Sequence, residues 1–363
     1  MGCVLMTSKV HFVKACIDEG ERRISEKARK LFKAAGLAKC FAPNDFTAVK
    51  IHIGEEGNTT HIKAGCLKGL IEELLKLETK PFLTDTNALY VGRRHNAVDH
   101  AALAAEHSFG KEVLGVPFIV ADGLLGTCET AVSINGEVNK EVLIASDLVR
   151  CQSILAVAHF TGHPATCAAA TLKTLGMGCA SKKGKMAQHA ALTLNITDDC
   201  TLCRQCFAHC PADAITLDDV QAHINQDKCI SCAECLAVCR FGAVKCNWGQ
   251  ETEILQKSIA EHALGVLQGK QKKAAFISFL ISITKDCDCF DTPDMPGIVE
   301  DIGILASTDP VAIDTAALDL VESKAHRKLP QLIERKELNP LHQLQHAQRI
   351  GLGTTDYELI ELK

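Results

Sequence analysis

Aromatic side chains are scarce in this chain of 363 residues. Phe, Trp and Tyr together make up 4% of the sequence, although hydrophobic residues as a whole reach 47%. A buried core must therefore consist mainly of Ala, Val, Ile and Leu, and such a core is typical of α/β proteins with a parallel sheet. The length is sufficient for two or three domains.

The sequence also lacks the long apolar segments that direct proteins into or across a membrane. Its longest apolar run, residues 274–283, is about half as long as a membrane-spanning helix, which needs ~20 residues. Lys9 and His11 interrupt the apolar start before the hydrophobic region of a secretory signal could form. We therefore expect no membrane insertion and a cytoplasmic location.

Excess positive charge and nucleotide-binding fingerprints are missing as well. The formal net charge of −5 argues against nucleic acid as a partner. Residues 178–185 resemble a P-loop but contain one residue too many before the second Gly, and Met186 stands where Ser or Thr would bind magnesium. Gly176 and Gly178 follow a segment with a helical pattern rather than a strand, so they do not form a dinucleotide-binding turn.

Cysteine, by contrast, is abundant, with 19 residues in the chain. Eight of them obey one spacing rule twice, with two, two and three residues between successive cysteines, and the second run repeats the first 29 positions later. This is the spacing of bacterial ferredoxins, in which cysteine thiolates hold iron–sulfur clusters. We therefore predict two [4Fe-4S] clusters as cofactors, bound as metal centres through these eight cysteines.

The spacing also predicts which cysteines share a cluster. In two-cluster ferredoxins the fourth cysteine of each run ligates the cluster of the other run. Zinc sites usually combine two short cysteine pairs, and disulfide frameworks suit short secreted chains, so neither alternative is favoured. The predicted ligands of cluster one are Cys200, Cys203, Cys206 and Cys239. The predicted ligands of cluster two are Cys229, Cys232, Cys235 and Cys210.

The other eleven cysteines are scattered and mostly stand in apolar context, which is typical of buried thiols in a reducing compartment. Cys287 and Cys289, separated by one residue, could bind a metal or change redox state. Two cysteines alone are weak evidence for either role, and we interpret them as plain thiols.

Hydrophobic periodicity alternates between strand and helix on both sides of the cysteine runs. Strands are predicted at residues 47–53, 81–84, 117–121, 153–158, 273–283 and 302–306, with a hairpin at 130–145. Helices are predicted at residues 21–39, 62–77, 95–107, 166–175 and 310–321. The alternation predicts an α/β fold, with a mostly parallel sheet and helices on both faces.

The predicted domain organisation follows from the position of the cysteine runs. We expect residues 1–190 and 249–363 to form one discontinuous α/β domain. Residues 191–248 would be an inserted α+β ferredoxin-like module with two [4Fe-4S] clusters. Two separate domains flanking this module remain an alternative.

Candidate site residues follow from the topology of open α/β sheets, in which ligands bind beyond the carboxyl ends of the strands. Four polar loops follow predicted strands, and they begin at His52, Asp85, His159 and Ser307. From these loops and from adjacent segments we select catalytic candidates in the crevice, namely Glu55, Asn58, His159, His163, Lys173, Asp309 and Asp314.

Each candidate also has a structural interpretation. Asp309 fits the N-cap of a helix that opens with Pro310, and we favour that role over catalysis. Asp314 lies near the apolar face of the same helix, where a carboxylate needs a partner. His159 and His163 could bind a metal, although hydrogen-bonded histidines are the simpler interpretation.

The polar loops and the cysteine runs together resemble the family called domain of unknown function 362, in its form with a two-[4Fe-4S] insert. The matching stretches are residues 49–58, 81–94, 159–164, 172–189 and 301–320. The resemblance implies a discontinuous α/β domain in an iron–sulfur protein, and it names no reaction. In the cysteine pattern, Arg240 follows Cys239 where the repeat predicts proline.

We interpret the chain as an iron–sulfur electron-transfer protein that passes electrons between a redox partner protein and an acceptor at the α/β domain, an unknown small molecule. The alternative is a protein that binds a partner or a metal for assembly, with clusters that deliver electrons or are structural. No catalytic motif can be recognised, so an oxidoreductase activity is left open.

Overall fold

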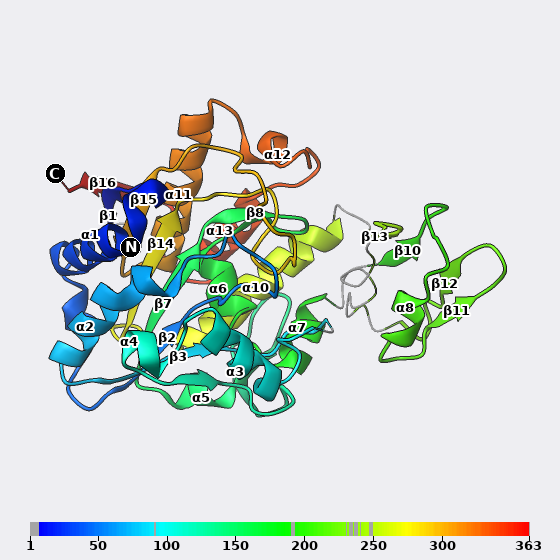
Figure 1. The fold of residues 1–363 in the computed structure, drawn as a ribbon, viewed down its shortest axis with the longest axis horizontal. Coiled ribbons are helices and arrows are strands. Elements are labelled where there is room, and N and C mark those ends of the chain that lie inside the picture. The colour runs from blue at the N-terminus through cyan, green and yellow to red at the C-terminus, as the bar shows by residue number, and fades with distance from the viewer. Residues whose placement is uncertain are drawn as a thin grey trace.

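A computed structural model describes residues 7–90, 92–189, 193–229, 231, 235, 239, 241–246 and 250–362. Its centre is an eight-stranded sheet with the order β16-β1-β15-β14-β7-β2-β3-β4 (Figure 1). The strands are β1 (Ser8–Lys14), β2 (Phe46–Lys50), β3 (Lys80–Asp85), β4 (Phe118–Val120), β7 (Ser153–His159), β14 (Ala274–Leu280), β15 (Gly303–Ser307) and β16 (Tyr357–Glu361).

The directions of the strands confirm a mostly parallel sheet. Five of the seven neighbouring pairs are parallel. Strand β15 runs antiparallel to both of its neighbours, β1 and β14. The strands come from chain segments on both sides of the cysteine runs.

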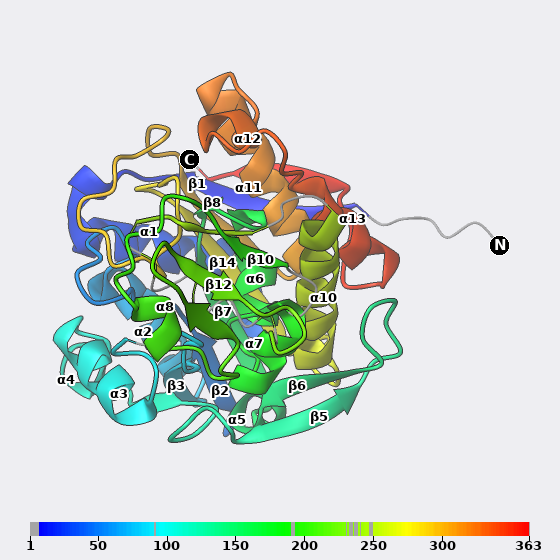
Figure 2. The same ribbon diagram turned by 90° about the vertical axis from the view of Figure 1, so that its right-hand side faces the viewer.

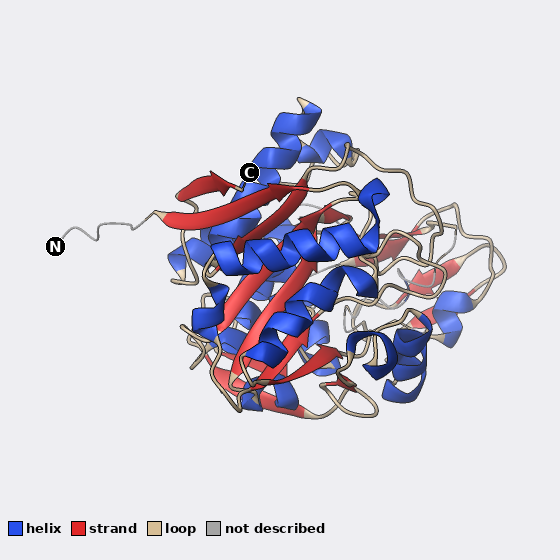
Figure 3. Ribbon diagram, turned by 60° about the vertical axis from the view of Figure 1, so that its left-hand side comes forward, coloured by secondary structure: helices blue, strands red, loops and turns tan. Residues whose placement is uncertain are grey.

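Helices cover both faces of this sheet (Figure 3), as predicted. The main ones are α1 (Gly20–Ala34), α2 (Lys68–Lys76), α3 (Ala97–Glu106), α6 (Thr171–Gly176), α10 (Gln250–Leu267) and α11 (Pro310–Ala325). The shorter ones are α4 (Lys111–Leu114), α5 (Ser146–Arg150), α7 (Lys182–His189), α8 (Gln205–Ala208), α12 (Leu329–Leu332) and α13 (Leu341–Arg349). Helix α10 packs beside α13 and α6 (Figure 2).

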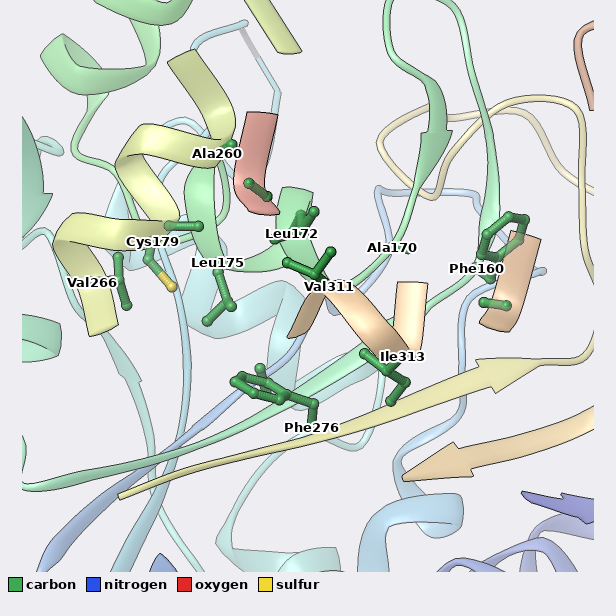
Figure 4. Close-up of a cluster of buried hydrophobic side chains, with 14 of the residues drawn as sticks. Phe160, Ala170, Leu172, Leu175, Cys179, Ala260, Val266, Phe276, Val311 and Ile313 are labelled. Atoms are coloured by element: carbon green, nitrogen blue, oxygen red, sulfur yellow. The ribbon is translucent and has the colours of Figure 1, made fainter. Parts of the chain in front are cut away.

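Alternating residues of the central strands divide the core into two layers. Phe276 of β14 packs in a cluster with Leu175 of α6 and Val311 of α11 (Figure 4). Ile277 and Phe279 of the same strand point to the opposite face and belong to the second cluster, which α1 and α2 cover. Because successive side chains of a strand point to opposite faces, a continuous apolar strand is buried on both sides.

One local prediction needs correction. The helix expected from residue 166 begins only at Thr171, and the preceding segment β9 (Cys167–Ala169) pairs with β8 (Thr161–His163). Cys167 has a φ of 66°, in the left-handed region, which a right-handed helix cannot contain. The hairpin predicted at residues 130–145 forms from β5 (Glu129–Ser133) and β6 (Glu141–Ala145).

The segment with the cysteine runs lies outside the large sheet, at one side of the molecule (Figure 1). In it, β10 (Leu194–Ile196) pairs with β13 (Val244–Cys246), and β11 (Ile215–Leu217) pairs with β12 (Ala222–Ile224). A small apolar cluster, separate from the two clusters around the large sheet, packs residues of this segment against Leu255 and Ile259 of α10. Cys232 and Arg240 lie outside the described residues. Within the described ranges, no helix has the length and hydrophobicity needed to cross a bilayer.

Asp309 is the N-cap of helix α11, as predicted. Its Oδ1 accepts hydrogen bonds from the amides of Val311 and Ala312, each at 2.9 Å. Its Oδ2 accepts from the Ser8 hydroxyl at 2.7 Å and from the Thr354 amide at 3.0 Å. The carboxylate therefore ties the first strand and the segment before the last strand to the start of a buried helix.

We expect Asp309→Ala to lower the free energy of unfolding by about 1–3 kcal/mol, because it removes a helix cap and leaves partly buried donors without an acceptor. Thermal unfolding followed by circular dichroism measures the loss. Asn96→Ala is the matched control, since Asn96 caps α3 through exposed hydrogen bonds that water can replace. An equal effect of the two substitutions would contradict the tethering role of Asp309.

Candidate functional site

Loops from four strands meet at one edge of the sheet. Strands β2, β3, β7 and β14 are parallel, so their carboxyl ends lie on the same side. His52 follows β2, Asp85 ends β3, His159 ends β7, and residues 281–290 follow β14. These loops line a cavity of about 790 Å³, together with residues of α6, α7 and the cysteine-rich segment. Its size is that of a small-molecule site.

The fourth predicted loop, which contains Asp309, lies at the opposite edge. Because β15 is antiparallel, its last residue Ser307 pairs with Phe276 near the start of β14, whereas Gly303 pairs with Leu280 at the end of β14. Three of the four polar loops selected from the sequence therefore lie together at one edge of the sheet. Asp309 does not line the cavity.

Asp314 is also absent from the cavity wall. Its two carboxylate oxygens accept hydrogen bonds from the amides of Thr171 and Leu172, at 2.9 and 2.8 Å. Burial raises the pKa of Asp314 to about 6, although these amides oppose the shift. Asp314 thus satisfies the free amides at the start of α6, the helix that carries Lys173.

The most unusual group in the cavity is a buried lysine between two thiols. Lys173 Nζ lies 3.4 Å from Cys287 Sγ and 3.9 Å from Cys289 Sγ. His52 Nε2 lies 3.3 Å from Cys289 Sγ. Within the described ranges, the partners of the Lys173 ammonium are these two sulfur atoms. A buried ammonium requires a compensating negative charge, and the thiols are the groups that can supply it.

The two thiols differ in protonation. A hydrogen bond from Cys287, together with Lys173 and His52, holds the pKa of Cys289 well below the usual thiol range although burial opposes this. The same hydrogen bond and burial hold the pKa of Cys287 well above that range. The lowered pKa favours the thiolate form of Cys289, and the raised pKa favours the thiol form of Cys287. The thiolate is the nucleophilic form of cysteine.

The turn that carries these thiols is fixed by surrounding groups. His159 Nδ1 lies 2.9 Å from Asp288 Oδ2, and His159 Nε2 lies 2.8 Å from the Ile281 carbonyl oxygen. Burial would lower the pKa of His159, but the Asp288 carboxylate raises it above its usual value. Both ring nitrogens therefore act as donors, and neither is free to bind a metal. The Asn58 side chain donates to the Phe290 carbonyl, so Asn58 braces the turn from outside the cavity.

His163 lines the cavity as a neutral ring. Its Nδ1 accepts hydrogen bonds from the amides of Ala165 and Thr166, each at 3.1 Å, so the proton resides on Nε2. Burial and the nearby Lys173 cation hold the pKa of His163 well below its usual value. The structure thus brings Glu55, His159, His163 and Lys173 together around one cavity.

A buried network of charges forms another wall. Arg94 Nε lies 2.9 Å from Glu55 Oε2, and the Arg94 guanidinium also lies 3.5 Å from the Asp85 carboxylate. Lys50 Nζ lies 3.0 Å from Asp85 Oδ1. Burial would raise the pKa of Asp85, but Lys50 and His100 hold it well below its usual value. The paired charges give this wall a rigid frame.

Some polar atoms at the cavity have no partner in the described part of the chain. Thr161 Oγ1, His189 Nδ1 and Asp288 Oδ1 are buried and make no hydrogen bond there. Buried polar atoms in native proteins are nearly always hydrogen-bonded. These three atoms therefore mark positions where a ligand or a water molecule would find a donor or an acceptor.

A second, small cavity lies in the cysteine-rich segment. Cys200, Cys203, Cys206 and Cys239 all line it. Cys239 lines the large cavity as well, together with Lys245. In the ranges that the structure describes, no three His, Cys, Asp or Glu side chains are arranged to hold a single metal ion.

Comparison with known proteins places the chain in a family. A family model described as Domain of unknown function (DUF362) matches residues 47–319, which is most of the chain. The chain belongs to this family. The match spans every residue that lines the large cavity except Arg335, so the cavity lies within the family's shared region.

Two curated proteins match short stretches of this DUF362 member. Indolepyruvate oxidoreductase subunit IorA of Archaeoglobus fulgidus is 35% identical over 54 residues, which are 15% of this chain and 9% of that protein. A subunit of the ion-translocating oxidoreductase complex of Methanosarcina acetivorans is 39% identical over 46 residues, which are 13% of this chain and 17% of that protein. The chain thus spans less than a fifth of either relative.

Two solved structures show a distant likeness. The lactate racemase apoprotein from Thermoanaerobacterium thermosaccharolyticum has a TM-score of 0.40 and 10% identity, over 76% of this chain and 50% of that one. A protein from Thermotoga maritima has a TM-score of 0.40 and 12% identity, over 88% of this chain and 59% of that one.

In this DUF362 protein we expect the alkylation of Cys289 by iodoacetamide to slow less with decreasing pH than that of an ordinary thiol, because the lowered pKa preserves more of the reactive thiolate. Lys173→Met removes the ammonium, raises the pKa of Cys289 and should lower the rate at neutral pH by about tenfold or more. Peptide mass spectrometry after timed alkylation measures both rates.

The control for Lys173→Met is Lys270→Met, which also removes a buried lysine. Lys270 Nζ hydrogen-bonds to the Val149 carbonyl and does not line the cavity. This control should leave the alkylation of Cys289 unchanged. A rate that falls about tenfold for each unit of decreasing pH in the native protein would show that Cys289 is an ordinary thiol.

Proposed function

We propose that this protein is an iron–sulfur electron-transfer protein. Two [4Fe-4S] clusters accept electrons from a redox partner protein and deliver them to an acceptor bound in the large cavity. Cluster one is held by Cys200, Cys203, Cys206 and Cys239. Cluster two is held by Cys229, Cys232, Cys235 and Cys210.

The four cysteines around the small cavity support cluster one. Three come from the first cysteine run, and Cys239 comes from the second run, which is the exchange of ligands that two-cluster ferredoxins use. Burial raises the pKa of Cys206, and Cys200, Cys203 and Cys239 add to the shift, as expected for four neighbouring thiols. A four-iron cluster binds one thiolate at each iron, so its ligands stand farther apart than those of a single ion.

The observation that carries the proposed function is the position of Cys239. This residue lines both the small cavity and the large one. A cluster ligated by Cys239 would therefore lie beside any molecule bound in the large cavity. The remaining candidates on the wall, Glu55, His159, His163 and Lys173, would contact or orient that molecule.

The relatives add support for a partner protein. The two curated proteins described above are named as oxidoreductase proteins, and the name of each describes it as a subunit. Clusters that pass electrons to an acceptor must be reloaded, and a partner protein would supply those electrons.

Protein purified without oxygen should contain about eight iron and eight sulfide per chain, as two four-iron clusters require. Metal analysis and sulfide determination on the full chain measure both. A content near four iron would remove one cluster from the proposal, and zinc in place of iron would remove both.

Cys239→Ala should damage cluster one rather than cluster two, because Cys239 lines the small cavity with Cys200 and Cys206. Electron paramagnetic resonance of the reduced protein distinguishes the two clusters. We expect the spectrum of Cys239→Ala to match that of Cys206→Ala. A match to Cys235→Ala instead would mean that each cysteine run keeps its own four ligands.

A further inference from the structure

Cys287 and Cys289 remain without a role in the proposed electron transfer, although they occupy the same cavity as Cys239. They are separated by one residue, and both sulfur atoms approach one ammonium, that of Lys173. Cys287 is buried, whereas Cys289 is partly exposed. The more accessible thiol is therefore the one that His52 also contacts, at 3.3 Å.

We propose that Cys287 and Cys289 form a redox-active dithiol–disulfide pair that reduces a low-molecular-weight disulfide bound in the large cavity and is itself reduced by the two clusters. This inference rests on the proposed function, because the clusters supply the electrons. It assigns the cavity a class of substrate and the two thiols a chemical role.

The backbone allows a disulfide bond between these residues. The amide of Phe290 donates to the Cys287 carbonyl at 3.1 Å, which closes a turn that begins at Cys287. Residues two apart lie at most ~7 Å from each other even in an extended chain, and a turn shortens this separation. Disulfide bonds need Cα atoms about 4.4–6.8 Å apart, so the pair requires little backbone movement.

The surroundings favour redox chemistry over metal binding. The Lys173 ammonium lies beside both sulfur atoms, where it would repel a metal cation. Asp288, between the two cysteines, is paired with His159, whose ring nitrogens are both occupied. Among the residues that the structure describes, no group of side chains here is arranged to hold a metal ion.

The charge state of the pair suits an attack on a disulfide. Lys173 Nζ at 3.9 Å and His52 Nε2 at 3.3 Å from Cys289 Sγ favour the thiolate form of Cys289, and burial favours the thiol form of Cys287. Reactive thiolates in proteins lie next to cations such as Lys and His and remain accessible, and Cys289 meets both conditions. Lys173 would continue to stabilise whichever sulfur carries the negative charge.

The reaction balances in two exchange steps. The Cys289 thiolate attacks one sulfur of the substrate disulfide, and the substrate S–S bond breaks to release a first thiolate. Cys287 then loses its proton, which the released thiolate takes up, and attacks Cys289 Sγ, so that a second thiolate leaves and the Cys287–Cys289 disulfide forms. Exchange of this kind proceeds through the mixed disulfide.

Two electrons and one proton restore the pair to a thiol and a thiolate. Each reduced [4Fe-4S] cluster gives up one electron, so the two clusters together supply the number that one disulfide bond requires. The redox partner protein reloads the clusters one electron at a time. Cys239 lines the same cavity as the pair, so a cluster that it ligates would border the space into which Cys289 opens.

The test is a reductive titration of the full chain, purified without oxygen and then treated with bis(2-hydroxyethyl) disulfide and desalted. Titanium(III) citrate is added stepwise while electron paramagnetic resonance follows the clusters. The native protein should consume about four electrons per chain, two for the disulfide and two for the clusters, and Cys289→Ser should consume about two. Cys128→Ser, which changes an exposed cysteine outside the cavity, is the matched control and should consume about four.

A second variant tests which cysteine attacks. In Cys287→Ser, the Cys289 thiolate has no resolving thiol, so treatment with bis(2-hydroxyethyl) disulfide should trap a mixed disulfide at Cys289, visible by peptide mass spectrometry. The native protein should instead show a Cys287–Cys289 disulfide. A mixed disulfide trapped at Cys287 in Cys289→Ser, with none in Cys287→Ser, would overturn the assignment of the attacking thiol.

Other outcomes separate this inference from the proposed function. Reducible clusters with equal electron consumption in the native protein and Cys289→Ser would overturn the dithiol inference and leave the electron-transfer function intact. A stoichiometric metal lost only in Cys289→Ser would also overturn it, in favour of a metal site. Chains in which no cluster can be reduced, native or variant, would overturn the proposed function and this inference together.

Discussion

The parallel direction of β2, β3, β7 and β14 is the constraint on which the site depends. Parallel strands end at the same edge of a sheet, so segments far apart in the sequence deliver their polar residues to one place. Lys173 and Cys287, for example, are 114 positions apart and yet in contact. The antiparallel strand β15 shows the converse, because its carboxyl end and Asp309 lie at the other edge. The direction of the preceding strand, more than the residue types in a loop, decides whether that polar loop lines the cavity.

Buried charge gives this edge its chemical character. Several cations on the cavity wall have a carboxylate partner, as Arg94 has Glu55 and Lys50 has Asp85. Lys173 instead faces sulfur. Leaving an ammonium unpaired in a buried position costs several kcal/mol, and ionising a nearby thiol offsets that cost. The ammonium of Lys173 and a thiolate beside it therefore stabilise each other in this buried position.

Much of the architecture could be predicted from the sequence. Alternating strand and helix patterns predicted the mostly parallel sheet with helices on both faces, and Asp-Pro predicted the cap at Asp309. The direction of each strand could not be predicted, because hydrophobic periodicity is the same whichever way a strand runs. The helix start before Thr171 was wrong because periodicity does not reveal the positive φ of Cys167. Cys287 and Cys289 were interpreted as plain thiols because nothing near them in the sequence indicates Lys173 or His52.

Cys239 lines both cavities, and this has a thermodynamic consequence for a protein that binds a cluster there. Occupancy of the large cavity and the charge on the adjacent cluster would be linked quantities. An anion in the cavity would disfavour the more negative, reduced cluster and so lower its midpoint potential. By reciprocity, reduction would weaken the binding of that anion by the same factor. Such a protein would release an anionic product more readily after reloading with electrons, without any moving part.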